Sequence, residues 1–127
     1  MNAKINKHQT AVAILNWNGL EHLKKYLPSV VEHSIEAAHV VVIDNGSTDQ
    51  SIAWCQEAFP NVEIIALNAN LGFAGGYNAG LKKIHAENYV LLNSDVRVTS
   101  NWIAPVLNAM EKETFSACQP IIRNDSD

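Results

Sequence analysis

The sequence lacks the features that mark several large classes of protein. Nine Lys and Arg residues stand against thirteen Asp and Glu residues, for a net charge of −4. No basic run offsets this balance, which argues against a nucleic-acid-binding protein. No apolar stretch approaches the ~20 residues of a membrane span, and residues 1–10 lack the apolar core of a signal peptide. We therefore expect a cytoplasmic protein, with the inner face of the membrane as one place where it works.

Motifs for redox, zinc and dinucleotide chemistry are missing as well. The two cysteines, Cys55 and Cys118, follow no CxxC spacing and are interpreted as reduced thiols. The five His residues show no HxxxH or HExxH pattern, so a zinc site is not expected. No GxGxxG follows the first apolar run, which argues against a Rossmann-like oxidoreductase.

What is present suits one folded domain over residues 1–127. Apolar residues make up 47% of the chain and charged residues 17%, which argues against intrinsic disorder. Short apolar runs alternate with segments of helical periodicity. This pattern predicts βαβ units, and hence an α/β fold with a mostly parallel sheet flanked by helices. The predicted strands cover residues 10–15, 39–43, 62–67 and 89–92, with a fifth at residues 115–122.

The predicted helices connect these strands. The first follows Gly19 and is expected to kink or break at Pro28, which has no N–H for a helical hydrogen bond. The second is capped by Ser47 or Thr48. The third follows the Asn- and Gly-rich loop of residues 68–76, and a fourth precedes the fifth strand.

Polar side chains stand at the carboxyl end of every predicted strand, the edge at which open parallel sheets bind ligands. Asp44 can accept a hydrogen bond from the imide N–H of a base, or it can cap its own turn through the N–H groups of Gly46 and Ser47. Asp95 can hold Mg²⁺ or Mn²⁺ against a diphosphate, or it can bond its own turn. Trp17 is placed for stacking, whereas the other two tryptophans are assigned to the core.

Residues 70–80 are rich in glycine and asparagine. Gly72, Gly76 and Gly80 are spaced by four, so on a helix they share one face and allow close packing on the sheet. Gly72 and Gly75 equally allow backbone N–H groups at a helix start to face a phosphate. The spacing alone favours neither interpretation.

Four segments, taken in order, carry a resemblance to a known family. They read VAILNWNG, VVVIDNGSTDQS, NANLGFAGGYNAG and YVLLNSDVRV, and they span about residues 11–107. Together they resemble the family 2 glycosyltransferases. The similarity is greatest to the rhamnosyltransferase-like members, whose donor site carries NLGFAxGxNxG and LLNxD. Each motif is weak alone, but their order and strand-end context make the match specific.

The resemblance implies a GT-A fold, which holds a nucleotide-sugar (a UDP-, dTDP- or GDP-sugar) at the carboxyl edge of its parallel strands. By position, Asp44 would bind the base, and Asp95 would match the last acid of the family's DxD-type motif. Asp95 would then hold Mg²⁺ or Mn²⁺, which stabilises the charge on the leaving diphosphate. The donor-binding residues carried over in this way are Leu15, Asn16, Trp17, Asp44, Asn70, Gly72, Asn78 and Asp95.

The chain departs from the family pattern in three places. Asn93 stands where DxD has its first acid, which leaves the metal one protein carboxylate. Tyr77 stands where many members have Arg, so neutralisation of the diphosphate depends more on the metal. The family's catalytic base lies well beyond residue 127, and the acids that follow Asp95 lack the context of a general base. We therefore expect a truncated, nucleotide-binding half without a catalytic residue or an acceptor half.

The complete enzyme would transfer a sugar with inversion to a hydroxyl of a saccharide or lipid-linked acceptor, in cell-surface polysaccharide synthesis. A non-catalytic nucleotide-binding or interaction module is the alternative. An absent half would leave sheet edges and apolar side chains uncovered, so we expect a homo-oligomer. The interpretation requires Asp44 and Asp95 to converge on one cleft across neighbouring strand tips.

Overall fold

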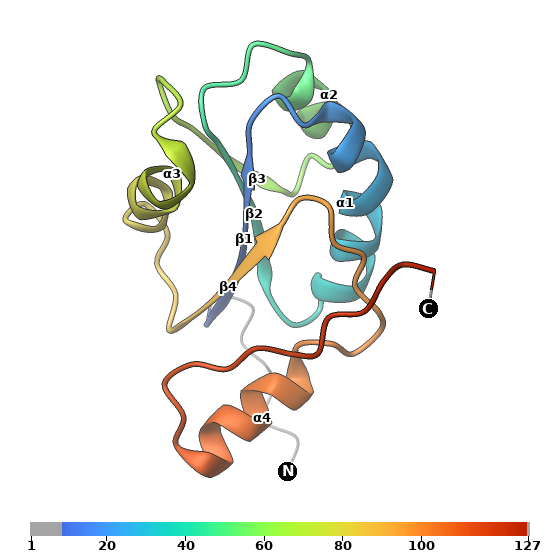
Figure 1. Cartoon of the computed structure of the whole chain (residues 1–127), viewed down its shortest axis with the longest axis vertical. Coiled ribbons are helices and arrows are strands. Elements are labelled where there is room, and N and C mark those ends of the chain that lie inside the picture. The colour runs from blue at the N-terminus through green and yellow to red at the C-terminus, as the bar shows by residue number, and fades with distance from the viewer. Residues whose placement is uncertain (1–8, 127) are drawn as a thin grey trace.

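The computed structural model describes residues 9–126, which form a four-stranded parallel sheet with helices on both faces (Figure 1). The sheet order is β3-β2-β1-β4 and every neighbouring pair is parallel. The predicted α/β class is confirmed. The strands are β1 (Thr10–Asn16), β2 (His39–Asp44), β3 (Glu63–Ala66) and β4 (Asn88–Asn93), and the helices are α1 (Leu20–Ser34), α2 (Ser51–Ala58), α3 (Gly72–Leu81) and α4 (Ala104–Glu113).

The central strands β1 and β2 are buried on both faces, as their continuous apolar sequences predict. Val12 and Val42 belong to a core under α1 and α2, whereas Ala13 and Ile43 belong to a second core under α3. Figure 1 shows α1 and α2 on one side of the sheet and α3 on the other. Two hydrophobic layers therefore fix the positions of the strand ends.

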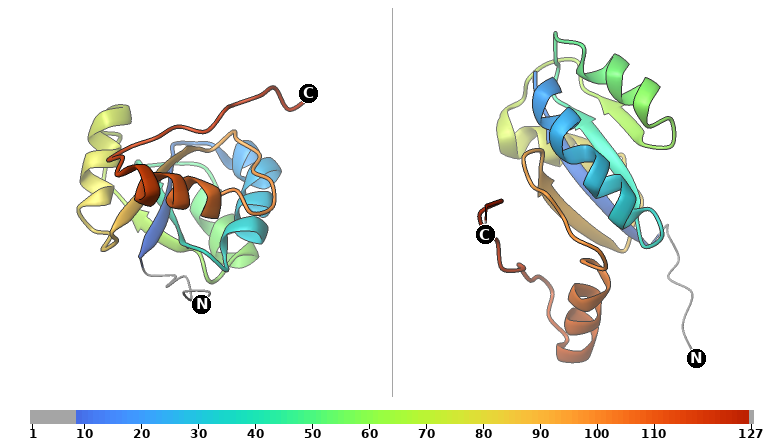
Figure 2. Two further views of the ribbon diagram at one scale, coloured as in Figure 1. Left: turned by 90° about the horizontal axis from the view of Figure 1, so that it is seen from below. Right: turned by 90° about the vertical axis from the view of Figure 1, so that its right-hand side faces the viewer.

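Helix α4 lies apart from these layers, beyond the amino ends of the strands (Figures 1 and 2). The chain approaches it along α1, where Trp102 Nε1 donates to Ser34 Oγ over 3.0 Å. Trp54 and Trp102 pack against the first core, as predicted. No helix of residues 9–126 has the length and apolar character needed to cross a bilayer. The carboxyl edge of the sheet is therefore not covered by α4.

Two expectations about local structure are wrong. Residues 115–122 form no strand, because the segment finds no strand partner within residues 9–126 and its apolar side chains Phe115 and Ile121 are 56% and 87% exposed. Of the kink or break expected at Pro28, the break is wrong, because helix α1 continues through Pro28 to Ser34. Pro28 is exposed, and so is Lys24, whose carbonyl would accept the missing helical hydrogen bond, so water can take the place of that bond.

Helix α3 begins at Gly72, inside the stretch predicted as a loop, because its glycines pack closely on the sheet. A Cβ on Gly80 would lie 2.4 Å from Cδ1 of Ile43, and a Cβ on Gly76 would lie 2.8 Å from Cδ1 of Leu15. A Cβ on Gly72 would meet no atom within 4 Å, but Gly72 has a φ of +77°, which favours glycine. Close packing therefore explains two of the three glycines spaced by four.

Candidate functional site

The strand order decides which polar residues lie side by side at the carboxyl edge. Asn16 of β1 pairs with Asp44 of β2, and Leu15 of β1 pairs with Asn93 of β4. Strand β1 therefore lies between β2, which ends at Asp44, and β4, which Asp95 follows. The expectation that Asp44 and Asp95 follow neighbouring strands is therefore wrong. Chain order does not reveal that β4 adds beside β1 and not beside β3. The two acids still follow strands that end at the same edge.

Asp44 is a buried carboxylate with a partner for each oxygen. It is 1% exposed. Its Oδ1 accepts a hydrogen bond from Asn16 Nδ2 over 2.9 Å, and its Oδ2 accepts one from the Ser47 N–H over 2.9 Å. The turn-capping bond considered for Ser47 is therefore present. Asn16 also donates to Ser47 Oγ over 3.2 Å, and its own Oδ1 is buried without a hydrogen-bond partner among residues 9–126.

Asn18 joins the loop after β1 to the loop after β2. Its backbone has a φ of 48°, in the left-handed region that Asn tolerates better than most residues. Its Oδ1 accepts hydrogen bonds from the N–H groups of Thr48 (2.8 Å) and Asp49 (3.2 Å), and its own N–H donates to Ser47 Oγ over 2.8 Å. Sequence reasoning missed this residue. The available signal was an Asn before Gly19 in a turn, but its partners lie about thirty residues away.

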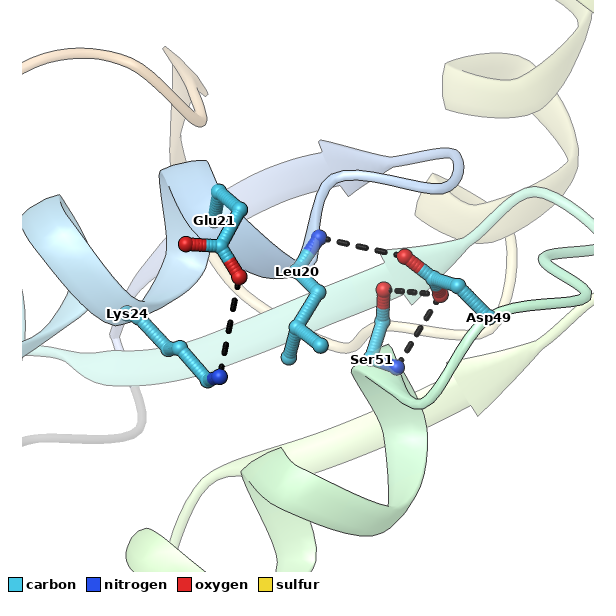
Figure 3. A network of polar contacts seen from close by, with 5 residues as sticks. All are labelled: Leu20, Glu21, Lys24, Asp49 and Ser51. Atoms are coloured by element: carbon cyan, nitrogen blue, oxygen red, sulfur yellow. Dashed lines mark hydrogen bonds and ion pairs between the residues drawn. The ribbon is translucent and has the colours of Figure 1, made fainter.

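Asp49 serves the first turns of two helices at once, as Figure 3 shows. Its Oδ2 accepts the N–H of Leu20 in α1 over 3.2 Å, and its Oδ1 accepts both the N–H (3.0 Å) and the hydroxyl of Ser51 in α2. Asp49 therefore takes the capping role that was expected of Ser47 or Thr48. Burial raises the pKa of Asp49, but the bonds from Ser51 and Leu20 outweigh it, so that the pKa lies below the usual 3.8. The site edge thus carries a charged aspartate at neutral pH.

The glycine-rich segment, residues 70–80, carries exposed asparagines and a buried tyrosine. Asn70 and Asn78 are exposed, and Asn70 Oδ1 accepts the N–H of Gly72 over 2.8 Å. Tyr77 is 4% exposed and donates its hydroxyl to the Leu92 carbonyl over 3.1 Å. Burial raises the pKa of Tyr77. At the position where the resemblance implies Arg in many members, this chain therefore has a neutral core residue.

A pocket of about 410 Å³ opens at the carboxyl edge, over the start of α1. Of the predicted donor-binding residues, only Trp17 lines it, and Trp17 is 56% exposed. Asp95 is exposed next to the lining residue Ser94. Asp44 and Asn16 are buried behind the loops, and Leu15 contacts α3 on the other face. The lining residues are Trp17, Asn18, Gly19, Leu20, Glu21, His22, Asp49 and Ser94.

Two further observations bear on what the edge can hold. Within residues 9–126 no three His, Cys, Asp or Glu side chains are grouped as a metal centre. A second cavity, of about 400 Å³, is lined by His39, Phe59 and Pro60, near the amino end of β2, and by none of the predicted site residues. Of these two cavities, the one at the carboxyl edge is lined by a predicted site residue, Trp17.

Residues 11–127 match the family described as Glycosyl transferase family 2. An uncharacterized glycosyltransferase of Haemophilus influenzae is 24% identical over 105 residues, which cover 80% of this chain and 32% of that protein. An N-acetylglucosaminyl-diphospho-decaprenol L-rhamnosyltransferase of Mycobacterium tuberculosis is 30% identical over 63 residues, which cover 50% of this chain and 20% of the relative. The chain thus spans about a third or less of the length of these curated relatives.

Solved structures share the fold at low sequence identity. S. aureus TarS in complex with UDP-GlcNAc aligns with a TM-score of 0.72 and 20% identity, over 84% of this chain and 32% of that chain. The mannosyltransferase PcManGT from Pyrobaculum calidifontis, in complex with GDP-Man and Mn²⁺, aligns with a TM-score of 0.69 and 18% identity, over 83% of this chain and 33% of that chain. These likenesses confirm the predicted GT-A fold.

Proposed function

The chain belongs to glycosyl transferase family 2, and on that premise we propose that its carboxyl sheet edge binds the nucleotide-sugar donor of a glycosyltransferase. One observation carries the proposal. The pocket at this edge is lined by the exposed Trp17 at the end of β1 and by Ser94 after β4, and Asp95 is exposed beside it. An aromatic face, a hydroxyl and a carboxylate are groups that can bind a base, a ribose and a metal-bound diphosphate.

The base is proposed to bind near the end of β1. A base stacked on an exposed aromatic side chain such as Trp17 gains about 1–3 kcal/mol. Asn16 Oδ1 is buried and lacks a donor within the described chain. Once the loops that cover it move aside, the ring N–H of uracil, thymine or guanine would supply one. Asp44 keeps an unused lone pair on each oxygen, so it too can accept from the base once the loop over it moves aside. UDP-GlcNAc and UDP, the ligands of TarS, carry such a ring N–H.

Asp95 and Asn93 are proposed to hold Mg²⁺ or Mn²⁺. Both side chains are exposed at the end of β4, and both offer the oxygen ligands that these hard cations prefer. One carboxylate suffices where a diphosphate and water complete the shell. The Mn²⁺ in the mannosyltransferase complex supports a divalent ion in this fold. When bound, the ion would stabilise the negative charge that develops on the leaving diphosphate.

The start of α3 is proposed to close over the nucleotide. Asn70 precedes the N-cap Leu71, Gly72 is the first residue of α3, and Asn78 lies six residues after Gly72 on the exposed side of the helix. The side chains of Asn70 and Asn78 can hydrogen-bond a ribose or phosphate without any change in the core. Their role in donor binding rests on the match to the family motif and on this exposure.

The reaction proposed for the complete enzyme is transfer of a hexose-type sugar, with inversion, to a hydroxyl of a saccharide or lipid-linked acceptor. The mycobacterial relative that is named an N-acetylglucosaminyl-diphospho-decaprenol L-rhamnosyltransferase supports a sugar of this class and a lipid-linked acceptor. The product that we propose is a cell-surface polysaccharide. We place the reaction in the cytoplasm, at the inner face of the membrane for a lipid-linked acceptor. Glu111, Glu113 and Asp125 are exposed and none of them lines the pocket. This chain is therefore proposed to supply donor and metal binding but not the catalytic base.

A second candidate is a non-catalytic module that binds a partner protein or a second copy of itself. The edge strand β4 favours it, because Tyr89 and Leu91 are 42% and 57% exposed and exposed apolar strands favour association. The expected homo-oligomer would form through this same surface of β4. Light scattering of the chain at high concentration tests it, and a monomer at all concentrations would contradict it.

Titration with UDP, dTDP and GDP, each with and without Mn²⁺, tests the donor site. We expect binding of at least one nucleotide, strengthened by the metal. Trp17→Ala should weaken this binding about tenfold or more through lost stacking. Phe115→Ala is the matched control, because Phe115 is an aromatic residue equally exposed, at 56%, outside the site. No binding by the folded chain at millimolar nucleotide would count decisively against the proposal.

A further inference from the structure

Asn45, the residue after β2, forms three hydrogen bonds with the segment that leads into α3. Its Nδ2 donates to Asn70 Oδ1 over 3.1 Å and to the Gly72 carbonyl over 3.0 Å, and its Oδ1 accepts the N–H of Leu71 over 3.0 Å. Asn45 is 2% exposed. One buried side chain thus satisfies three polar groups, from three consecutive residues, that lie twenty-five or more positions along the chain.

Close packing around Asn45 fixes the position of residues 69–72 relative to the end of β2. A Cβ on Gly76 would lie 2.8 Å from Asn45 Nδ2, so α3 approaches Asn45 only because residue 76 lacks a side chain. A Cβ on Gly46 would lie 2.7–2.9 Å from the backbone of Ala69 and Asn70. The loops after β2 and β3 are therefore in direct backbone contact. The hydrogen bonds of the Asn45 amide determine which residues of the two loops lie opposite each other.

We infer that Asn45 is a positioning residue for the donor site. It holds residues 69–72 against the end of β2, so that Asn70 and the start of α3 face a nucleotide bound at the carboxyl edge. The inference rests on the proposed function, because holding this loop matters for binding only if the carboxyl edge is a donor site. Asn45 itself need not touch the nucleotide, since it is buried and its side chain is occupied by the loop.

Two substitutions separate the parts of this role. Asn45→Ala removes all three bonds. Asn45→Asp keeps the volume and an acceptor for the Leu71 N–H, but it cannot donate to Asn70 or Gly72. Asn108→Ala is the matched control, because Asn108 is exposed on α4, away from the site.

The measurements are amide hydrogen exchange by NMR and UDP affinity with Mn²⁺, both far below the unfolding temperature. In Asn45→Ala we expect the Leu71 amide to exchange at least tenfold faster, while the Val41 amide in β2 keeps its protection. In Asn45→Asp the Leu71 amide should stay closer to wild type. UDP should bind about tenfold more weakly to both variants, and Asn108→Ala should change neither quantity.

Unchanged UDP affinity in both Asn45 variants, with Leu71 exchange accelerated in Asn45→Ala, would overturn the inference. Unchanged Leu71 exchange in Asn45→Ala would overturn it as well. A residue that only stabilised the fold would lower the melting temperature and leave the affinity of the folded chain intact. Should Asn45→Ala unfold, Asn45→Asp carries the affinity test alone. A wild-type chain that binds none of UDP, dTDP and GDP would instead refute the proposed function.

Discussion

Replacement of Gly80 by alanine tests whether α3 is held against the sheet by the absence of side chains. A Cβ at this position would lie 2.4 Å from Cδ1, 2.6 Å from Cγ2 and 2.7 Å from Cγ1 of Ile43. Ile43 is 0% exposed. Its Cγ1 and Cγ2 are attached directly to Cβ, so they cannot move aside as the end of a flexible side chain could. Either α3 or β2 must shift.

The expected loss of stability follows from two opposing effects. Overpacking of a filled core costs about 1–3 kcal/mol, whereas alanine in place of glycine inside a helix gains up to about 1 kcal/mol. The net effect of Gly80→Ala is a loss of about 1–2 kcal/mol in the free energy of unfolding. For a domain of this size that corresponds to a fall of roughly 4–8 °C in Tm.

Gly75→Ala is the matched control in the same helix. Its Cβ would meet only the Cβ of Leu71, at 3.2 Å, and Leu71 is 52% exposed. We expect this variant to be as stable as the wild type or up to about 1 kcal/mol more stable. Urea unfolding followed by circular dichroism measures both variants. If Gly80→Ala proved as stable as Gly75→Ala, the close approach of α3 to Ile43 would be refuted.

Two further predictions concern charge and reactivity. The folded-state pKa of Asp49 is lowered, so its stabilisation of the fold is complete above the usual value of 3.8 and is lost as the pH falls through the folded-state value. Asp49→Ala should therefore lower the free energy of unfolding by about 1–2 kcal/mol at pH 7. Urea unfolding should show that this difference from wild type shrinks below pH 3. A difference that did not depend on pH would contradict the expected role of the Asp49 charge. Burial raises the pKa of the Cys55 thiol to about 11, so iodoacetamide at pH 7.5 should alkylate the exposed Cys118 alone. Mass spectrometry locates the label. Label on Cys55 in the folded chain would show that Cys55 is not buried.

Much of the fold could be predicted because its strands are apolar on both faces. The runs at residues 10–15 and 39–43 match β1 and β2 within one residue, since only buried parallel strands need continuous Ala, Val, Ile and Leu. The start of α3 was mispredicted because glycine and asparagine usually mark loops. In this chain Gly76 and Gly80 are helical residues whose small size serves packing on the sheet.

The site could be predicted only in part, because its residues act across long distances in the chain. The polar strand ends indicated the correct edge, but strand order is a tertiary property, and it placed β1 between Asp44 and Asp95. Asn18 and Asn45 look like ordinary turn residues in the sequence. Their hydrogen bonds run to residues 25 to 31 positions away, which local turn chemistry does not reveal.

Paramagnetic line broadening by Mn²⁺ in the presence of UDP tests the central claim most directly. Mn²⁺ broadens the amide signals of residues close to it, so an NMR spectrum of the chain reports where the metal–nucleotide complex lies. Our account predicts selective broadening at residues 93–95 and at Trp17, with the signals of Pro60's neighbours at the other end of the sheet unaffected. Selective broadening near residues 59–62, or none with UDP at saturating concentration, would contradict the placement of the donor at the carboxyl edge.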